Sequence, residues 1–442
     1  MQKLRFIDLF CGIGGMRLGF ESAAFSLNYQ TECVLSSEID KDAQLVYKQN
    51  FGHAPLGDIR LIPELPDHDF LLAGFPCQSF SHAGKKQGFG DTRGTLFFEI
   101  MRLVDTAKPK AFIFENVRGL YTHDKGRTLE TIKHEIIARG YSFNAFLLNS
   151  SNFNLPQNRV RLYIVGILNA VPQFKLISDL GAKDSHSYNY EQLSLFYPDR
   201  KNVTVADILE DNPASKYDCS PQFVAALKRL FKDDLSKLNG VRLIDYRGGN
   251  SIHSWSIGLR GECNQDEIEL MNRFILKRRN KEFGSQQDGK LLNKEQIASF
   301  FPHPHLDEIL ASLVSKKYLK ISDRKYKPVS GNFSFEVYKF LDPQKISVTV
   351  VASDANRLGV YHQQRVRRIT PREAARLQGF PDNFILHSDD NKAYYQLGNS
   401  VSINVVKAVA EEVILNTLSH KQQKQEVRCC ALARHRNNVA KD

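Results

Sequence analysis

The 442-residue sequence lacks any long hydrophobic run, and none of its apolar segments approaches the roughly 20 residues that a membrane-spanning helix requires. Its seven cysteines form no even, closely spaced framework, and no signal-peptide pattern follows the start Met-Gln-Lys-Leu-Arg. These absences exclude a disulfide-stapled secreted protein and a membrane protein. We therefore expect free thiols in the reducing cytoplasm.

Nucleotide-binding motifs of two common kinds are also missing. No G-x-x-x-x-G-K-[ST] sequence is present, which excludes a P-loop. The segment Phe6-Ile-Asp-Leu-Phe-Cys-Gly-Ile-Gly-Gly15 joins an apolar stretch to a glycine turn, but Arg17 stands where the dinucleotide fingerprint G-x-G-x-x-G requires its third glycine. This departure disfavours a nicotinamide-dependent dehydrogenase.

Negative charge is in the minority. The sequence has 60 Lys and Arg against 49 Asp and Glu, which gives a formal net charge of +11 and a pI near 9.1. Such a balance favours a polyanionic partner, because cations neutralise phosphates and release counterions. A solvated basic surface is the alternative, so the charge alone does not decide between them.

Short apolar runs alternate with helical patterns through the first half of the chain. This alternation is typical of βα units around a buried sheet. We expect strands at 5–10, 33–37, 69–73, 111–114 and 162–165, and helices at about 15–25, 41–49, 94–106 and 127–138. The sequence therefore predicts the α/β class, with a Rossmann-like mixed, mostly parallel sheet and helices on both faces.

The alternation stops after about residue 168, where the sequence becomes more polar and rich in Lys, Arg, Asn and aromatic residues. Amphipathic segments resume near residue 366. We predict one domain from 1–168 and 395–418, a smaller domain at 169–394, and a basic tail at 419–442.

Three features near the predicted strand ends favour a nucleoside ligand. The glycine turn lets a backbone approach a ligand closely. Glu38 follows the second predicted strand, where a carboxylate can accept hydrogen bonds from ribose hydroxyls, and Asp58 lies in the loop before the third. Each acidic residue alone is more often a helix cap or a solvated turn, and the ordered set carries the prediction.

Cys77 ends the segment Gly74-Phe-Pro-Cys77 at the rim of the predicted sheet. Two further strands bring Glu115 and the pair Arg159 and Arg161 to comparable positions. Because positive charge near a thiol lowers its pKa, this grouping indicates a reactive thiolate. The alternative is a buried, inert cysteine, which is how we interpret Cys11.

These motifs resemble the S-adenosylmethionine-dependent DNA cytosine-5 methyltransferases of bacterial restriction-modification systems. The resemblance covers residues 5–166 and 365–406. It rests on five ordered blocks: Phe6-Ile-Asp-Leu-Phe-Cys-Gly-Ile-Gly-Gly15, Gly74-Phe-Pro-Cys-Gln-Ser-Phe-Ser81, Glu115-Asn-Val117, Gln157-Asn-Arg-Val-Arg161 and Gln396-Leu-Gly-Asn-Ser-Val401.

The resemblance implies a role for each candidate catalytic residue. Cys77 would add to carbon 6 of a cytosine that has been flipped from the duplex. Glu115 would contact ring nitrogen 3 and the exocyclic amine, while Arg159 and Arg161 would orient the base and the active-site loop.

The resemblance also implies S-adenosyl-L-methionine as cofactor, S-adenosyl-L-homocysteine as product, and no metal. The residues expected at the cofactor are Phe10, Gly12, Gly14, Gly15, Glu38, Ile39, Asp58, Ile59, Pro76, Leu96, Asn399 and Val401.

The segment outside the matched blocks is expected to read the target sequence. The residues expected to contact DNA are Gln78, Ser81, Arg247 and Arg260. Within the smaller domain, helical patterns at 294–301 and 305–315 and a hairpin pattern at 318–327 suggest a winged-helix-like insert at 290–330. Two helices and a hairpin also describe many ordinary subdomains.

Two alternatives share some of these features. One is a methyltransferase of the same fold that acts on transfer RNA, and the other is a noncatalytic nucleoside-binding or DNA-binding module. For the DNA methyltransferase we expect double-stranded DNA as partner and a monomer in the bacterial cytoplasm, associated with the nucleoid through DNA. A cognate restriction endonuclease would be linked in function without binding.

Overall fold

The computed structural model describes residues 2–76, 96–178, 202–245, 251–285, 290–329 and 335–419. Contacts divide the chain into two units. The first unit comprises Met1–Ile208, Ser347–Ser353 and Pro371–Asp442, and the second comprises Leu209–Ile346 and Asp354–Thr370.

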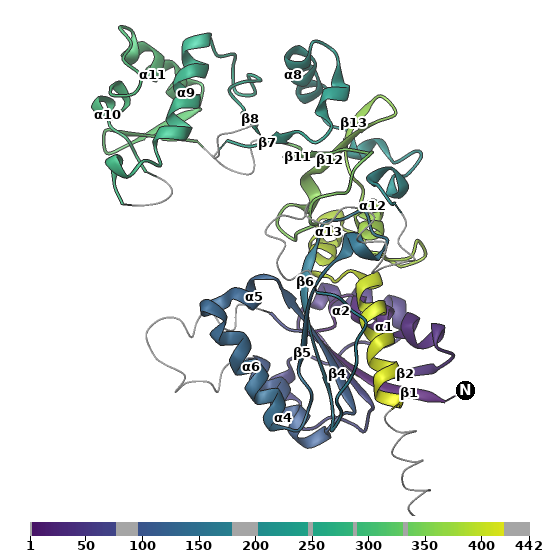
Figure 1. Ribbon diagram of the computed structural model, residues 1–442. Helices are drawn as coiled ribbons and strands as arrows, with labels where there is room; N and C mark the ends of the chain where they lie inside the picture. The colour runs from purple at the N-terminus through teal and green to yellow at the C-terminus, as the bar shows by residue number, and fades with distance from the viewer. Residues whose placement is uncertain are drawn as a thin grey trace, which may run out of the picture. The chain divides into compact units, whose positions relative to one another are not determined.

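One six-stranded sheet forms the centre of the first unit, in the order β2-β1-β3-β4-β6-β5 (Figure 1). β1, β2, β3 and β4 are parallel, and β6 runs antiparallel to both β4 and β5. A mixed, mostly parallel sheet was expected, and the structure confirms it. The strands are β1 (Lys3–Leu9), β2 (Gln30–Ser37), β3 (Phe70–Gly74), β4 (Ala111–Val117), β5 (Asn144–Asn149) and β6 (Val160–Ile167).

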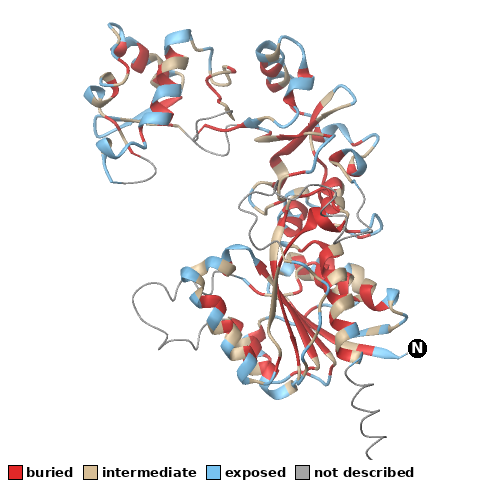
Figure 2. Ribbon diagram, in the orientation of Figure 1, coloured by how far each residue is buried: buried red, intermediate tan, exposed pale blue. Residues whose placement is uncertain are grey.

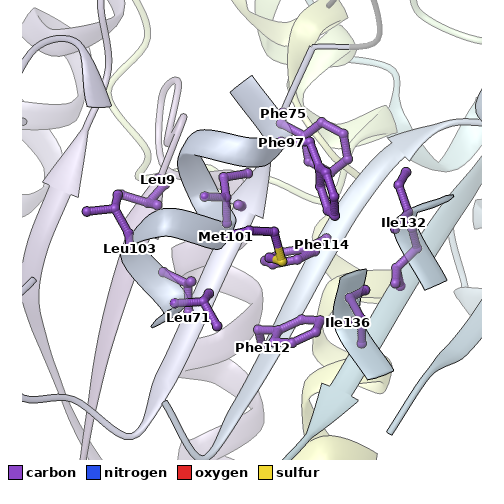
Figure 3. Packing of buried hydrophobic residues seen from close by; sticks show 14 of the residues in the cluster. Leu9, Leu71, Phe75, Phe97, Met101, Leu103, Phe112, Phe114, Ile132 and Ile136 are labelled. Carbon is purple, nitrogen blue, oxygen red and sulfur yellow. The ribbon is translucent and has the colours of Figure 1, made fainter. Parts of the chain in front are cut away.

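Helices cover both faces of this sheet. They do so because the central strands are apolar on both sides, and each side must be shielded from water. On one face α4 (Leu96–Ala107) and α6 (Arg127–Ala138) pack against Leu71, Phe112 and Phe114 (Figure 3). On the other face α1 (Gly15–Ser26) and the helix at 403–419 pack against Phe6 and Phe70. Figure 2 shows the strands as a buried layer between these helices.

The described part of this unit also contains four other α-helices. They are α2 (Lys41–Phe51), α5 (Gly119–Thr122), α12 (Pro371–Leu377) and α13 (Asp390–Asn399). The chain thus leaves the sheet unit after Ile208, returns to it briefly at Ser347–Ser353, and returns again at Pro371 to supply α12, α13 and the final helix.

The unit boundaries at Ile208 and Pro371 differ from the domain boundaries that the sequence predicted, at 168/169 and 394/395. Residues near Ile208 belong to the sheet unit because the guanidinium of Arg376 donates a hydrogen bond of 3.1 Å to the Ile208 carbonyl. Residues after α12 belong there because the side chain of Gln378 is buried and bonded to Gln157. The assignment of the intervening residues to target recognition stays a prediction.

The second unit contains a five-stranded sheet in the order β13-β12-β11-β7-β8, with α8 (Pro221–Phe231) packed against it through Phe223 and Leu227. Its strands are β7 (Arg242–Leu243), β8 (Ser251–Ile252), β11 (Lys339–Leu341), β12 (Leu358–His362) and β13 (Arg365–Arg368).

A second core in this unit gathers three helices and a hairpin around Phe274, Leu310 and Leu319. The helices are α9 (Gln265–Lys277), α10 (Lys294–Ala298) and α11 (Leu306–Ser315), and the hairpin pairs β9 (Leu319–Ser322) with β10 (Lys325–Pro328). No helix in the described parts of the chain is both long and apolar enough to span a membrane.

Candidate active site

The turn after β1 lies at the carboxyl edge of the parallel strands, where ligands bind in open α/β sheets. Phe10, Gly12 and Gly14 all have positive φ, at 55°, 53° and 93°. The Gly14 amide donates 2.7 Å to the Cys11 carbonyl, and α1 begins at the next residue. Positive φ at two of these positions is the reason why glycine is needed there. The result is a tight turn in which Phe10 and Gly12 are half-buried.

Glu38 joins the end of β2 to this turn. Its Oε2 accepts a 2.9 Å hydrogen bond from the amide of Gly12, and its Oε1 accepts bonds of 2.8 and 2.9 Å from the amides of Ile39 and Asp40. Hydrogen bonds from backbone N–H groups to a carboxylate are shorter and stronger than those between neutral groups. Glu38 therefore fixes the shape of the turn and also presents a carboxylate to the adjacent space.

A cavity of about 440 Å³ opens beside the turn, and its volume lies within the range of small-molecule sites. Segments far apart in the sequence line it, all of them in the first unit. The lining residues are Phe10, Cys11, Gly12, Ile13, Gly15, Met16, Glu38, Ile39, Asp40, Ala43, Gly74, Glu115, Tyr395, Gln396, Asn399, Ser400 and Val401.

Two features of the lining suit a polar ligand. Gln396 is 6% exposed, and its amide Nε2 has no hydrogen-bond partner among the described residues, although a buried donor without a partner is costly. Gly15 allows the 400–401 segment to approach α1, since a Cβ there would lie 2.6 Å from Ser400 Oγ. The cavity therefore offers an unused donor and a close-fitting wall.

Glu115 lies at one wall of this cavity, at the end of β4. Its Oε1 lies 3.3 Å from Nε of Arg161 on β6, and the two side chains are 12% and 15% exposed. Burial raises the pKa of the Glu115 carboxyl, and the charges of Arg161 and Arg159 oppose that rise. The carboxyl therefore keeps a proton to higher pH than an exposed glutamate, which is what a general acid requires.

Arg159 has a different environment, although only one residue separates it from Arg161. Its guanidinium donates 2.7 Å to the Val350 carbonyl and also bonds the carbonyls of Gly398 and Ser400. Burial and the charge of Arg161 lower the pKa of Arg159 to about 9, so it remains charged at neutral pH. Arg159 thus holds the segment that forms the cavity wall.

The predicted nucleophile, Cys77, lies outside the described residues, as do Gln78, Ser81 and Arg247. The last described residues before Cys77 are Phe75 and Pro76. There the side chain of Asn116 donates a buried 2.9 Å hydrogen bond to the Phe75 carbonyl. Because Asn116 follows Glu115 on β4, one strand carries both the carboxyl and the anchor for the end of β3.

The cavity brings together seven of the residues expected at the cofactor, namely Phe10, Gly12, Gly15, Glu38, Ile39, Asn399 and Val401. Five others do not line it. Gly14 caps α1, Ile59 is buried in the hydrophobic core, and the carboxyl of Asp58 pairs with Arg60. Pro76 is exposed, and Leu96 begins α4.

Some lining residues were not expected from the sequence. Asp40 caps α2 by accepting hydrogen bonds from the amides of Asp42 and Ala43, and it lies two residues after Glu38. Tyr395 precedes the last block, and Ser400 lies within it between the predicted residues Asn399 and Val401. Their proximity to Glu38 and Asn399 in the sequence was the only available signal.

Arg260, which was expected to contact DNA, has structural contacts instead in the second unit. Its guanidinium donates 2.6 Å to the carbonyl of Lys317, and its amide donates 2.9 Å to the hydroxyl of Tyr318. These bonds tie the segment before α9 to the start of the hairpin. A role for Arg260 in DNA binding stays a prediction.

Comparison with known proteins finds a family that this chain matches. The model of the C-5 cytosine-specific DNA methylases matches residues 4–415. The chain is 57% identical to the Type II methyltransferase M.BanI of Aneurinibacillus aneurinilyticus over 418 residues, covering 95% of this chain and 97% of that protein.

Two further comparisons agree. The chain is 57% identical to the Type II methyltransferase M.HgiCI of Herpetosiphon aurantiacus over 408 residues, covering 92% of this chain and 96% of the relative. Among solved structures, a methyltransferase encoded within a prophage (E. coli) has a TM-score of 0.50 at 21% identity, covering 93% of this chain and 99% of its own. That likeness concerns the fold.

Proposed function

The chain belongs to the C-5 cytosine-specific DNA methylase family, and from this membership we propose its reaction, site residues and partners in detail. The protein transfers a methyl group to carbon 5 of a flipped-out cytosine in a specific double-stranded DNA sequence. The observation that carries the assignment of the site is the pair of Glu115 and Arg161, whose side chains are largely shielded from water and of which Glu115 lines the cavity.

The chemistry explains why a thiol and a carboxyl are required. Carbon 5 of cytosine is a weak nucleophile, so the ring must first be activated by a bond between carbon 6 and the sulfur of Cys77. As this bond forms, negative charge moves onto the ring. The protonated carboxyl of Glu115 donates a proton or hydrogen bond to ring nitrogen 3, and the raised pKa of that carboxyl supports this role.

The cavity residues fit S-adenosyl-L-methionine. When bound there, this cofactor supplies an electrophilic methyl group and leaves as S-adenosyl-L-homocysteine. Glu38 presents its carboxylate to ligand hydroxyls, and Gln396 supplies the unused amide donor. No metal is part of the proposal, and among the described residues no group of His, Cys, Asp or Glu side chains is arranged to hold one.

The two arginines have separate roles in this proposal. Arg161 contacts Glu115, so it orients that carboxyl and limits how far its pKa rises. Arg159 is a positioning residue, because its donors engage the carbonyls of Val350, Gly398 and Ser400. After carbon 5 has been methylated, the proton on carbon 5 is lost to a base and the bond from carbon 6 to Cys77 breaks, which frees the thiolate and releases 5-methylcytosine.

Duplex DNA is the proposed partner. A stacked base cannot reach a covalent nucleophile, so the cytosine must leave the helix. We assign target reading to the second unit, with Gln78, Ser81, Arg247 and Arg260 as candidate DNA contacts. The reported similarity to Type II methyltransferases supports protection of host DNA in a restriction-modification system. On this proposal the protein acts as a cytoplasmic monomer, and the companion endonuclease does not bind it.

Bisulfite sequencing of plasmid DNA after incubation with protein and S-adenosylmethionine tests the proposal. The expected result is a conversion-resistant cytosine in one sequence context, which disappears with Cys77→Ser. Cys33→Ser, which changes a half-buried thiol on β2 away from the cavity lining, serves as the matched control for folding. No protected cytosine in any context would reject the DNA assignment, and methylation of labelled transfer RNA would then support the alternative substrate.

A further inference from the structure

Residues 265–285 and 290–328 of the second unit, with α9, α10, α11 and the β9–β10 hairpin, form one core, and we name them the winged-helix subdomain after the order of their elements. A main-chain bridge from Leu292 to Tyr326 adds a third extended segment beside β10. The order is therefore helix, extended segment, helix, helix and hairpin, around one core (Figure 1). Such a subdomain can present either α11 or the hairpin to a partner.

The exposed face of α11 has the wrong charge for a polyanion. Its exposed side chains are Asp307, Glu308, Ala311 and Ser315, with no cation among them. Asp307 pairs with Lys294 at 2.6 Å, which satisfies one carboxylate within the protein. Two carboxylates in the first turn would repel the phosphates that flank a groove.

The hairpin carries the opposite charge. Lys320, Arg324 and Lys325 are exposed and Lys327 is half-buried, against one exposed carboxylate, Asp323. None of the four cations forms an ion pair with any residue in the described parts of the chain. On and beside α11, by contrast, Lys294 pairs with Asp307 at 2.6 Å and Lys316 with Glu267 at 2.7 Å.

The register of the hairpin concentrates this charge on one face. Lys320 lies directly opposite Lys327, and Lys325 lies opposite Ser322 on the same face, because alternate residues of a strand point the same way. Like charges in directly opposite positions destabilise a hairpin. That repulsion is relieved when an anion lies across the face. At the tip, Asp323 and Arg324 have φ of 49° and 57°, so a two-residue turn exposes the Arg324 side chain.

We propose that the β9–β10 hairpin, and not α11, is the part of the winged-helix subdomain that binds the sugar-phosphate backbone of DNA, through Lys320, Arg324, Lys325 and Lys327. This inference rests on the proposed function, since it assigns a surface to the same substrate. The hairpin supplies affinity and salt dependence, whereas the choice of bases belongs to other parts of the second unit.

The test is the salt dependence of DNA binding by the full chain, measured by fluorescence anisotropy with a fixed duplex that the wild type methylates. The hairpin variant Lys320→Gln/Arg324→Gln/Lys325→Gln removes three exposed cations. We expect the slope of log Kd against log salt to fall by about 2.7, at about 0.9 for each lost phosphate contact. The matched control Lys3→Gln/Lys48→Gln/Lys108→Gln removes the same charge from exposed positions of the sheet unit and should leave the slope unchanged.

Ala311→Glu provides the complementary test, because Ala311 is exposed on α11. If the hairpin is the contact, this variant changes Kd by less than about twofold. A large loss of binding with Ala311→Glu, or a hairpin variant with the wild-type slope, would overturn the assignment. A hairpin variant that only loses solubility would show that these lysines protect a strand edge, and would also overturn it.

Unchanged S-adenosylmethionine affinity and an unchanged melting temperature show that the variants are folded. Failure of the proposed function has a separate signature, because the wild type would then leave no methylated cytosine in DNA. A wild type that methylates DNA with a salt slope unaffected by the hairpin variant would reject the inference alone.

Discussion

Arg161 Nε lies 3.3 Å from Glu115 Oε1, and both side chains are largely shielded from water. The two residues are 46 positions apart in the sequence, and antiparallel pairing of β4 with β6 brings their strand ends together. Burial favours the neutral carboxyl and the arginine favours the charged one. This opposition leaves Glu115 able to hold a proton and to release it as the reaction proceeds.

Glu115→Gln should abolish most methyl transfer while leaving the fold intact. Glutamine can hydrogen-bond to the ring but cannot deliver a proton, so we expect kcat to fall about 10²- to 10⁴-fold. Transfer of a tritiated methyl group to DNA measures this. The exposed Glu130→Gln on α6 is the control, and a Glu115→Gln enzyme within threefold of the wild type would rule out the acid role.

Glu38→Gln should weaken binding of S-adenosylmethionine about 10- to 100-fold. The two carboxylate oxygens of Glu38 accept hydrogen bonds from the backbone amides of Gly12, Ile39 and Asp40. The substitution replaces one of these oxygens by an NH2 group, which then faces a backbone N–H that it cannot bond. Isothermal titration calorimetry provides the measurement. Glu32→Gln, in the exposed part of the same strand, should bind as the wild type does, and equal losses in both variants would point to general instability of β2.

Arg159→Gln should lower both stability and cofactor affinity. The variant loses hydrogen bonds to the carbonyls of Val350, Gly398 and Ser400, and each buried carbonyl left unpaired costs about 1–3 kcal/mol. Urea unfolding and cofactor titration should change together, because the 398–400 segment lines the cavity. Arg139→Gln, which removes a half-buried arginine whose ion-pair partners Asp105 and Glu135 keep access to solvent, should cost less than about 1 kcal/mol. A stable variant with normal cofactor affinity but no activity would instead indicate direct contact of Arg159 with the base.

Asp8 makes stability depend on pH. Its carboxyl is fully buried on β1, and burial raises its pKa from 3.8 to about 8, although the charge and the backbone N–H of Arg17 oppose that rise. The folded state holds the proton more tightly than the unfolded state does. The stability that protonated Asp8 contributes is therefore complete below pH 3.8 and is lost as the pH rises towards 8. The free energy of unfolding should therefore fall by up to about 1.4 kcal/mol per pH unit in that window.

Asp8→Asn should flatten this dependence, because asparagine has the same shape and no titration. Urea unfolding at several pH values between 5 and 8 measures the slope. The exposed Asp67→Asn serves as control, with 94% of the Asp67 side chain open to solvent. Parallel pH curves for Asp8→Asn and the wild type would refute the prediction.

Local sequence predicted the elements of the sheet unit well. The strand expected at 111–114 is found at Ala111–Val117, and the helix expected at 127–138 is found at Arg127–Ala138. Apolar periodicity is a local property, and both elements bury a continuous apolar face. The boundaries between the units differ from the predicted domain boundaries, because they follow from long-range contacts, of which that between Arg376 and Ile208 is one example.

In the site, too, the sequence predicted some features and left others to long-range contacts. Glycine spacing and the blocks around Cys77, Glu115 and Arg161 identified the family and its chemistry from sequence alone. The blocks could not separate the tasks of Arg159 and Arg161, which differ only in the partners that each meets.

The sequence by itself determined the reaction class, because a thiol, a carboxyl and a glycine turn are required in order along the chain. Only the tertiary structure decided which residues share a surface. Gln396 and Gly12 line one cavity, and Arg159 holds Ser400, across separations of more than 200 residues. In the hairpin, pairing of β9 with β10 sets Lys320 opposite Lys327. Strand order, register and chain return create these proximities, and no local pattern of residues encodes them.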